Sequence, residues 1–413
     1  MNKKFLATAL GAVISVMATA QTVTIFQTNG EKIKYNVSDV EKIVFEEEKP
    51  FDKTNLLSEE YVPCEAFREW IDEHLAGGTG YYSLEEAAAY TGEIDLSREE
   101  GVTDITGIEY FTGLTVLKGE DAYFGDFDIS ALKSLQYLQL VNTRVTRLDF
   151  TGLEALEKAF ISRNKLTYVN LAQNPNLQKL WCDCNELTSL DLTGCTGLLE
   201  LVCSYNQLQS LILPECPLEI LSAHVNTIYN INLSGVKSTL QHLSVSNCGL
   251  NSLDVSGASK LTYFNASGNP LMTTPDITGC TRLEEFRLED ITVEMHLDFS
   301  ECSKLYMLRM DRCNLGKSID LTRNKKLYEL SLQDSNLEEI NLSGLINLGY
   351  VNISDNAFRR IDVSKADGIY AFYANRNKYN AEVKVWTDFN LSNPEAQGFY
   401  VDDKIKLVYE FRE

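Results

Sequence analysis

Residues 177–195 read LQKLWCDCNELTSLDLTGC, and their spacing of apolar residues returns along the chain every 20 to 22 residues. Copies of this stretch begin at Leu114, Leu135, Leu156, Leu177, Leu198, Leu218, Leu240, Leu261, Leu283, Leu305, Leu327, Leu348 and Ile369. Most of them fit the pattern L-x-x-L-x-[LC]-x-x-N-x-L-x-x-L-[DN]-L-[ST]-G. A regular period of this length indicates similar coils stacked in one array rather than several ordinary globular domains.

The first part of each copy alternates inward and outward residues, which is the pattern of a strand. Leu180, Leu201, Leu221 and Leu243 hold the same inward position in successive copies. One copy cannot bury its apolar side alone, whereas a stack of copies can. The end of each copy is short, as in Asp191-Leu192-Thr193, and suits extended or 3-10 segments with tight turns. The sequence therefore predicts a leucine-rich-repeat solenoid, a β-rich horseshoe with a parallel concave sheet and short convex segments.

Two further columns of the repeat are predicted to be structural. An Asn that can satisfy backbone groups at the turn recurs at Asn164, Asn185, Asn206, Asn226, Asn269, Asn356 and Asn377. The ten Cys fall mainly at repeat-phased positions, so we expect mostly free, buried thiols, although a disulfide between neighbours such as Cys195 and Cys216 stays open. Cys182 and Cys184 lack a second ligand pair at zinc spacing, so no metal site is expected.

The start of the chain differs from the repeats. Residues 1–20 have the basic start, short apolar run and small-x-small end of a signal peptide, with cleavage expected after Ala20. No Cys lies at that point, so the protein is not expected to be a lipoprotein. No later stretch is long and apolar enough for membrane insertion of the mature chain. Residues 21–49 read as a β module with a hairpin turn at Asn29-Gly30 and a third strand around residues 40–45.

The remaining chain is expected to form three segments. Residues 50–93 have helical spacing, with Phe67, Trp70 and Ile71 on one face and Leu84 and Ala87 on another, and predict a helical N-terminal cap. Residues 94–380 hold the repeat array, with about 13 copies. Residues 381–413 lose the period and are expected to form capping strands, because the last coil would otherwise expose its core.

Charge is concentrated near the start of the chain. The chain has 59 acidic and 37 basic residues, a net charge of −22, of which −17 falls between residues 21 and 130. This acidity argues against nucleic acid as a partner, since binding to a phosphate backbone depends on Lys and Arg. The repeats that follow carry both signs nearly in balance, so the acidity indicates a solvated front end rather than a cationic ligand.

Outward residues of the concave strands are the candidates for ligand binding, because the fold does not require them. Phe160, Trp181 and Val202 would place three consecutive apolar groups in solvent, with Lys158 and Lys179 beside them. Exposed apolar surface marks binding sites, and aromatic residues dominate interface energies. The alternative is that the N-terminal cap covers these residues.

Two more groups fall on the outward positions. Arg287, Arg309 and Glu285 belong to a run of charges that is either a self-paired lattice or a polar docking patch. Five tyrosines offer stacking surfaces for a protein or a glycan, namely Tyr306, Tyr328, Tyr350, Tyr370 and Tyr373. Catalysis is not expected: His224 and His242 fall on neighbouring copies near serines, but no G-x-S-x-G motif or phosphate-binding Gly loop is present, and no cofactor is expected.

At this point the chain resembles the internalin-like leucine-rich-repeat proteins exported by bacteria. Its copies of 21 to 22 residues, with Cys182 and Cys203 on the inner column, are similar to those of the internalin J type, and VTDITGIE at residues 102–109 resembles the family's capping repeat. The resemblance implies an exported, non-catalytic protein of the periplasm, cell surface or extracellular space that binds a protein through its concave strands. Binding of a glycan or cell-wall polysaccharide, as in adhesion, is the alternative.

Overall fold

A computed structural model describes residues 4–9, 12–18, 22–26, 32–36 and 54–411 of the chain. The chain divides into two compact units, Met1–Asn55 and Leu56–Glu413. The cap, repeats and closing strands, which the sequence separates near residues 94 and 381, therefore belong to one unit, as expected when each coil shares its core with the next. In the described part of the chain, no helix has the length and apolar character needed to cross a membrane.

The first unit contains an antiparallel sheet of four strands, in the order β1 (Lys4–Ala9), β2 (Ala12–Ala18), β3 (Thr22–Phe26) and β4 (Lys32–Asn36). Strands β3 and β4 pair from Thr22 with Asn36 to Phe26 with Lys32. The turn predicted at Asn29-Gly30 and the third strand predicted around residues 40–45 lie outside the described residues. The signal peptide stays a prediction, since the conformation of β1 and β2 does not report on cleavage.

The second unit begins with helices α1 (Glu65–His74) and α2 (Leu84–Ala89), which lie where the helical spacing predicts them. Phe67 and Ile71 of α1 and Ala87 of α2 are fully buried in the core. A capping box starts α2: the Glu86 amide donates to Ser83 Oγ (3.1 Å), and the Ser83 amide donates to the Glu86 carboxylate (2.8 Å). The 3-10 helix η2 (Ile108–Tyr110) follows before the first full repeats.

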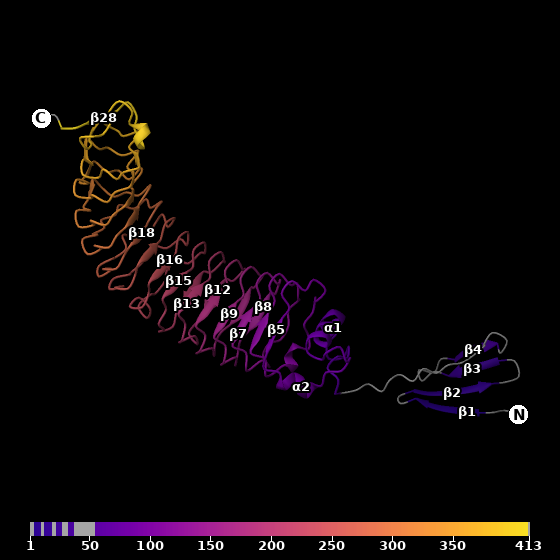
Figure 1. Cartoon of the computed structure of the whole chain (residues 1–413). Helices are drawn as coiled ribbons and strands as arrows, with labels where there is room; N and C mark the ends of the chain where they lie inside the picture. Colours follow the sequence, from indigo (N-terminus) through magenta and orange to yellow (C-terminus); the bar gives the residue numbers. More distant parts are fainter. Residues whose placement is uncertain (1–3, 10–11, 19–21, 27–31, 37–53, 412–413) are drawn as a thin grey trace. The chain divides into compact units, whose positions relative to one another are not determined.

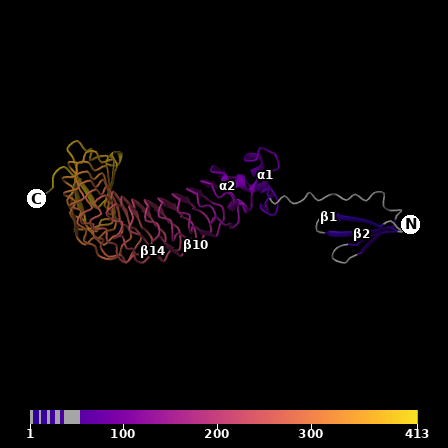
Figure 2. The same ribbon diagram turned by 90° about the horizontal axis from the view of Figure 1, so that it is seen from below.

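A 15-stranded parallel sheet forms the concave face of the second unit (Figure 1). Its strands, in order, are β5 (Glu93–Asp95), β6 (Val116–Lys118), β7 (Tyr137–Gln139), β9 (Lys158–Phe160), β11 (Lys179–Trp181), β13 (Glu200–Val202), β15 (Ile220–Ser222), β16 (His242–Ser244), β17 (Tyr263–Asn265), β18 (Glu285–Arg287), β19 (Met307–Arg309), β21 (Glu329–Ser331), β23 (Tyr350–Asn352), β25 (Ala371–Tyr373) and β27 (Phe399–Tyr400). Neighbouring strands align repeat on repeat, so that Leu180 lies beside Leu201 and Leu201 beside Leu221. Figure 2 shows the same coils following one another along a single stack.

The opposite, convex side carries small sheets of two or three strands, all parallel. Its strands are β8 (Arg147–Asp149), β10 (Tyr168–Asn170), β12 (Ser189–Asp191), β14 (Ser210–Ile212), β20 (Ser318–Ile319), β22 (Glu339–Ile340), β24 (Arg360–Asp362), β26 (Ala381–Lys384) and β28 (Ile405–Val408). Between the concave strands, the described coils thus use short extended segments, as the short second half of each repeat predicts. The predicted leucine-rich-repeat solenoid is confirmed.

Buried side chains hold the coils together. The middle residues of the concave strands, such as Leu180, Leu201 and Leu221, are fully buried and form one continuous core. Asn206 shows how the Asn column supports this core. Its Nδ2 donates to the carbonyls of Cys182 (3.0 Å) and Cys203 (3.1 Å), and its Oδ1 accepts from the Leu187 amide (3.0 Å). The prediction that the Asn column is structural is confirmed.

The cysteines behave as small buried residues. All ten are free, and eight of them are buried, whereas Cys64 is half-buried and Cys184 is exposed. Burial raises the pKa of the Cys195 thiol to about 12, and its Sγ lies 3.7 Å from the Leu171 carbonyl of the preceding coil. The expectation of mostly free, buried thiols is confirmed by this arrangement.

The repeat array extends further than residue 380. After the loop that contains the 3-10 helix η3 (Glu395–Gln397), β27 pairs in parallel with β25 and places Phe399, fully buried, beside Phe372. This last concave strand lacks the leucine spacing because residues 385–398 form a longer connection than in other coils. On the convex side, β26 and β28 pair in parallel, so two strands form within residues 381–413, where capping strands are expected.

Candidate ligand-binding face

Three aromatic side chains from consecutive concave strands form a patch, called here the aromatic patch: Tyr137, Phe160 and Trp181. The rings of Tyr137 and Phe160 have centroids 5.4 Å apart, and those of Phe160 and Trp181 meet edge to face at 5.0 Å. Trp181 is 39% exposed, and Phe160 and Val202 are half-buried on the same outward column. The described part of the N-terminal cap therefore leaves Trp181 accessible to a ligand.

Glu200 fixes the orientation of the exposed indole. Trp181 Nε1 donates to Glu200 Oε1 (2.8 Å), and Lys179 Nζ donates to Glu200 Oε2 (2.7 Å). The Glu200 side chain is only 13% exposed, so its carboxylate is shielded by the two groups it binds. The sequence reasoning missed Glu200, although its register beside Lys179 on the next strand predicts an opposite-charge pair.

The cations of this region differ in their pairing. Lys118 forms an ion pair with Glu93 (2.5 Å) and lies 5.9 Å from the centre of the Tyr137 ring. Lys158 lies between Tyr137 and Lys179 in the register of the sheet. Among residues 54–411, Lys158 has no ion-pair partner within 4 Å. The Lys158 ammonium group beside the aromatic patch can therefore pair with a carboxylate of a partner.

The predicted arginine group lies further along the same sheet and is internally paired. Arg287 contacts Glu285 (3.4 Å) on its own strand, and Arg309 pairs with Glu329 on the next strand. In the following turn, Arg312 binds Asp290 through two hydrogen bonds (2.5 and 2.9 Å). We call these contacts the charge lattice; they favour the self-paired interpretation over a polar docking patch.

Acidic groups are crowded within the charge lattice. Burial, together with the neighbouring Asp311, raises the pKa of Glu289, which contacts Arg312 at 3.8 Å. Asp311 accepts hydrogen bonds from Ser331 Oγ (2.7 Å) and from the Gln333 amide (2.7 Å). Other groups of the protein already bind these carboxylates, so few of their oxygens remain available to a ligand.

The five predicted tyrosines form two sets rather than one group. Tyr306 and Tyr328 lie one residue before their concave strands and stack at 5.2 Å with a plane angle of 7°. Tyr328 also reaches Tyr370 (6.2 Å) across the coil between them, where a Cβ on Gly349 would lie 2.5 Å from the Tyr328 ring. We call this first set the edge tyrosines.

The second tyrosine set lies on the concave strands themselves. Tyr350 and Tyr373 have ring centroids 5.8 Å apart, and Tyr373 stacks on Tyr400 at 4.8 Å with a plane angle of 12°. Sequence reasoning missed Tyr400 because its strand follows the irregular connection. The two sets also differ in their position within the repeat. Tyr306 directly follows the first Leu of its repeat, whereas Tyr350 lies two residues after the first Leu of its own repeat.

The two histidines near the serines of the concave face contact different neighbours. His224 Nδ1 lies within hydrogen-bonding distance of both Ser204 Oγ (2.8 Å) and Ser222 Oγ (3.1 Å), and burial lowers its pKa. Within residues 54–411, its other ring nitrogen has no hydrogen-bond partner that would orient it as a general base requires. His242 instead stacks on Tyr263 at 4.2 Å. Both imidazoles serve the packing of the concave surface.

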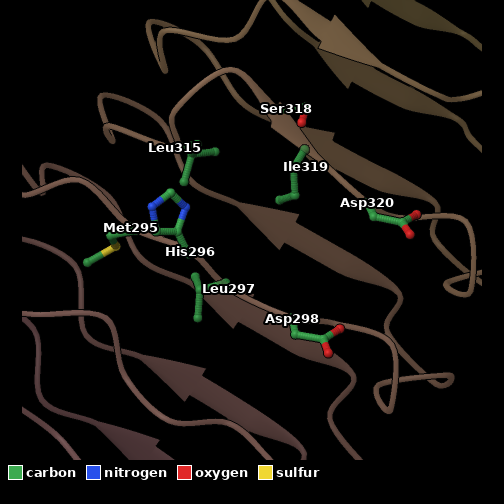
Figure 3. A pocket seen from close by; sticks show the side chains of 8 residues that line it. All are labelled: Met295, His296, Leu297, Asp298, Leu315, Ser318, Ile319 and Asp320. Atoms are coloured by element: carbon green, nitrogen blue, oxygen red, sulfur yellow. The ribbon is translucent and has the colours of Figure 1, made fainter.

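A hollow on the convex side, of about 220 Å³, is lined by Met295, His296, Leu297, Asp298, Leu315, Ser318, Ile319 and Asp320 (Figure 3). Its two carboxylates support their own turns: Asp298 accepts from the Ser300 amide (2.8 Å) and Asp320 from the Thr322 amide (2.9 Å). The His296 ring lies at the other end of the hollow from them. Across the residues with described positions, no cluster of His, Cys, Asp and Glu suited to a metal ion is found.

Comparison with known proteins gives matches among solved structures. No protein-family model matches the sequence, and a search of curated proteins finds no match. The functional domain of InlJ from Listeria monocytogenes, which includes a cysteine ladder, is similar with a TM-score of 0.68 and 27% identity over 81% of this chain and 72% of that one. The internalin InlF of the same species has a TM-score of 0.54 and 16% identity, over 87% and 98% of the two chains.

More distant matches share the fold. The leucine-rich-repeat ectodomain of the Arabidopsis thaliana receptor kinase GASSHO1/SCHENGEN3, solved in complex with CASPARIAN STRIP INTEGRITY FACTOR 2, has a TM-score of 0.58 and 17% identity over 82% of this chain and 45% of that one. In this chain, Cys182 and Cys203 are buried in adjacent coils of the inner column, which parallels the cysteine ladder named for InlJ. The chain therefore has the leucine-rich-repeat fold, and in its repeats and inner cysteines it is similar to the internalins.

Proposed function

We propose that this protein is a non-catalytic binding module that recognises a protein through the aromatic patch on its concave face. The observation that carries the proposal is Trp181, an indole that is 39% exposed and held in place by Phe160 and Glu200. A rigid, exposed Trp offers a large contact area with little loss of side-chain freedom on binding. The similar ectodomain of GASSHO1/SCHENGEN3 was solved in complex with CASPARIAN STRIP INTEGRITY FACTOR 2, which supports a binding role.

The patch also defines the chemistry of the partner segment. A large apolar side chain of the partner would contact Phe160 and Trp181, and a carboxylate beside it would pair with Lys158, which has no ion-pair partner among residues 54–411. Lys179 is already paired with Glu200, so the partner's carboxylate should pair with it less favourably than with Lys158. The ligand is therefore a protein segment that presents an apolar residue next to an acidic one.

A displayed peptide library selected on the full chain tests the proposal. Enriched peptides should carry a large apolar residue next to Asp or Glu, and Trp181→Ala should weaken their binding at least tenfold, as expected when a hot-spot aromatic residue is removed. Tyr229→Ala is the matched control, because this Tyr is 57% exposed but lies outside the concave strands. Enriched peptides that bind the Trp181→Ala variant as well as the natural chain would refute the proposal.

We also propose that the protein is exported and acts outside the cytoplasm, as the signal peptide at residues 1–20 predicts. Internalin-like structure is consistent with this location. Expression of the full chain in a bacterial host, followed by fractionation and N-terminal mass spectrometry, should give a periplasmic or external protein that begins at Gln21. An intact Met1 on protein retained in the cytoplasm would contradict export.

A further inference from the structure

The concave face has a hollow near its C-terminal end, separate from the aromatic patch and from the hollow on the convex side. It has a volume of about 230 Å³ and is lined by Gln333, Tyr350, Asn352, Ser354, Tyr373, Asn375 and Arg376. None of these side chains is aliphatic. Pockets for drug-sized ligands span roughly 300–1,000 Å³, so this hollow suits one small polar ring rather than a longer apolar group.

A chain of hydrogen bonds fixes the polar wall of the hollow. Asn352 Nδ2 donates to Gln333 Oε1 (3.1 Å), and Gln333 Nε2 donates to Asp355 Oδ2 (3.0 Å). Arg376 closes the chain by binding Asp355 through Nε (2.6 Å) and Nη2 (2.5 Å). The amides are therefore oriented before a ligand arrives, which lowers the entropy lost on binding.

The same chain also neutralises the charge of the wall. The Arg376 guanidinium is matched by the Asp355 carboxylate, and the hydrogen bonds from Arg376 hold the pKa of Asp355 below its usual range. The groups that remain for a ligand are uncharged. In the part of the chain that the structure describes, the side-chain amide of Asn375 makes no hydrogen bond, so it has both a donor and an acceptor to offer.

The tyrosines of the hollow present polar rather than apolar surface to it. The rings of Tyr350 and Tyr373 pack against each other at an angle of 46°, and Tyr373 stacks on Tyr400 at 4.8 Å. A tyrosine hydroxyl can both donate and accept a hydrogen bond. A purely apolar peptide side chain would leave the hydroxyls and the amides without partners, which is unfavourable.

We propose that this hollow binds one pyranose ring of a neutral sugar, with its hydroxyls bonded to Asn375, Asn352 and the tyrosine hydroxyls. A pyranose carries several hydroxyls around one compact ring, and each of them can both donate and accept a hydrogen bond. The proposed peptide site around Trp181 lies on other strands, β9 and β11, so the two sites are independent.

Saturation-transfer NMR on the full chain tests this proposal with neutral methyl pyranosides of glucose, galactose, mannose and N-acetylglucosamine. At roughly 10 mM sugar, a site with a Kd near 1 mM is about 90% occupied, so weak binding is still detected. At least one pyranoside should receive saturation, and Tyr373→Ala and Asn375→Leu should each weaken its binding tenfold or more. Asn375→Leu keeps the size of the side chain while removing both hydrogen-bonding groups.

Two control variants make the outcome decisive. Trp181→Ala and Tyr306→Ala should leave the transfer unchanged, because neither residue lines the hollow. Circular dichroism and thermal unfolding confirm that each variant is folded; where Tyr373→Ala unfolds, Asn375→Leu alone decides. No transfer to any neutral pyranoside would overturn the proposal. Transfer to glucuronic acid alone, or transfer that persists in Asn375→Leu, would overturn it as well.

Discussion

The aromatic patch and the charge lattice occupy the same concave sheet but use their outward residues differently. Beneath both, leucines such as Leu201 and Leu330 are fully buried at equivalent positions. In the aromatic patch, Trp181 remains 39% exposed, whereas in the charge lattice Arg309, Arg312 and their acidic neighbours bind one another. The comparison teaches that repeat position fixes what lies inside, while neighbouring coils decide whether an outward residue is available to a partner.

The largest expected effect tests whether the two regions share one scaffold. Leu201→Ala and Leu330→Ala each remove a fully buried side chain and leave a cavity, so each should lower the free energy of unfolding by about 2–5 kcal/mol. Denaturant unfolding followed by circular dichroism measures both. If either variant lost less than about 1 kcal/mol of unfolding free energy, the two regions would not share the same buried core, and the comparison would fail.

The Asn column gives the next largest effect. Asn206→Ala, in the coil next to the aromatic patch, and Asn356→Ala, beyond the charge lattice, should each cost about 1–3 kcal/mol, because buried backbone groups lose their partners. Cys248 fills the same position naturally, with its Sγ 3.2 Å from the Ala223 carbonyl, so Asn206→Cys should cost less than Asn206→Ala. If the Cys and Ala variants lost the same free energy of unfolding, the hydrogen bonds of the Asn column would not account for its contribution to stability.

Double-mutant cycles in salt distinguish the surfaces themselves. The coupling between Phe160 and Trp181 should be about 0.5–1.5 kcal/mol and should not change between 0.05 and roughly 0.5 M NaCl, as for an edge-to-face ring contact. The coupling between Arg309 and Glu329 should be about 1 kcal/mol or less and should fall as salt screens the charges. If the Phe160–Trp181 coupling energy fell with salt as much as the Arg309–Glu329 coupling energy, the two surfaces would not differ in the type of contact that they use.

The smallest effect concerns the pH dependence of the charge lattice. Because folding raises the pKa of Glu289, its charged form is disfavoured in the folded state. Its contribution should therefore be most favourable below its unfolded pKa of about 4.3 and should be lost as pH rises through the higher folded value. Relative to the Glu289→Gln variant, the natural chain should become less stable as pH rises from 4 to 7. An opposite slope would show that Arg312 dominates.

The period of the repeat explains which parts of the fold and of the candidate site could be predicted from the sequence. Leu180 and Asn206 recur at fixed offsets, so their inward roles follow from the sequence alone. Phe399 was missed because the longer connection before β27 breaks the offset that marks other inward residues. Glu200 and Gln333 act through side chains on neighbouring coils, and such lateral contacts depend on register and side-chain direction as well as on spacing.

One glycine changes how the coils depend on each other. Because Gly349 has no side chain, Tyr328 contacts Tyr370 two coils away, past the coil that separates them. In a linear array where each coil contacts only its neighbours, unfolding from an end can stop at any boundary. A contact between second neighbours ties two boundaries together, so these coils should open as one block. We therefore expect the edge tyrosines to oppose unfolding that starts from the end of the array.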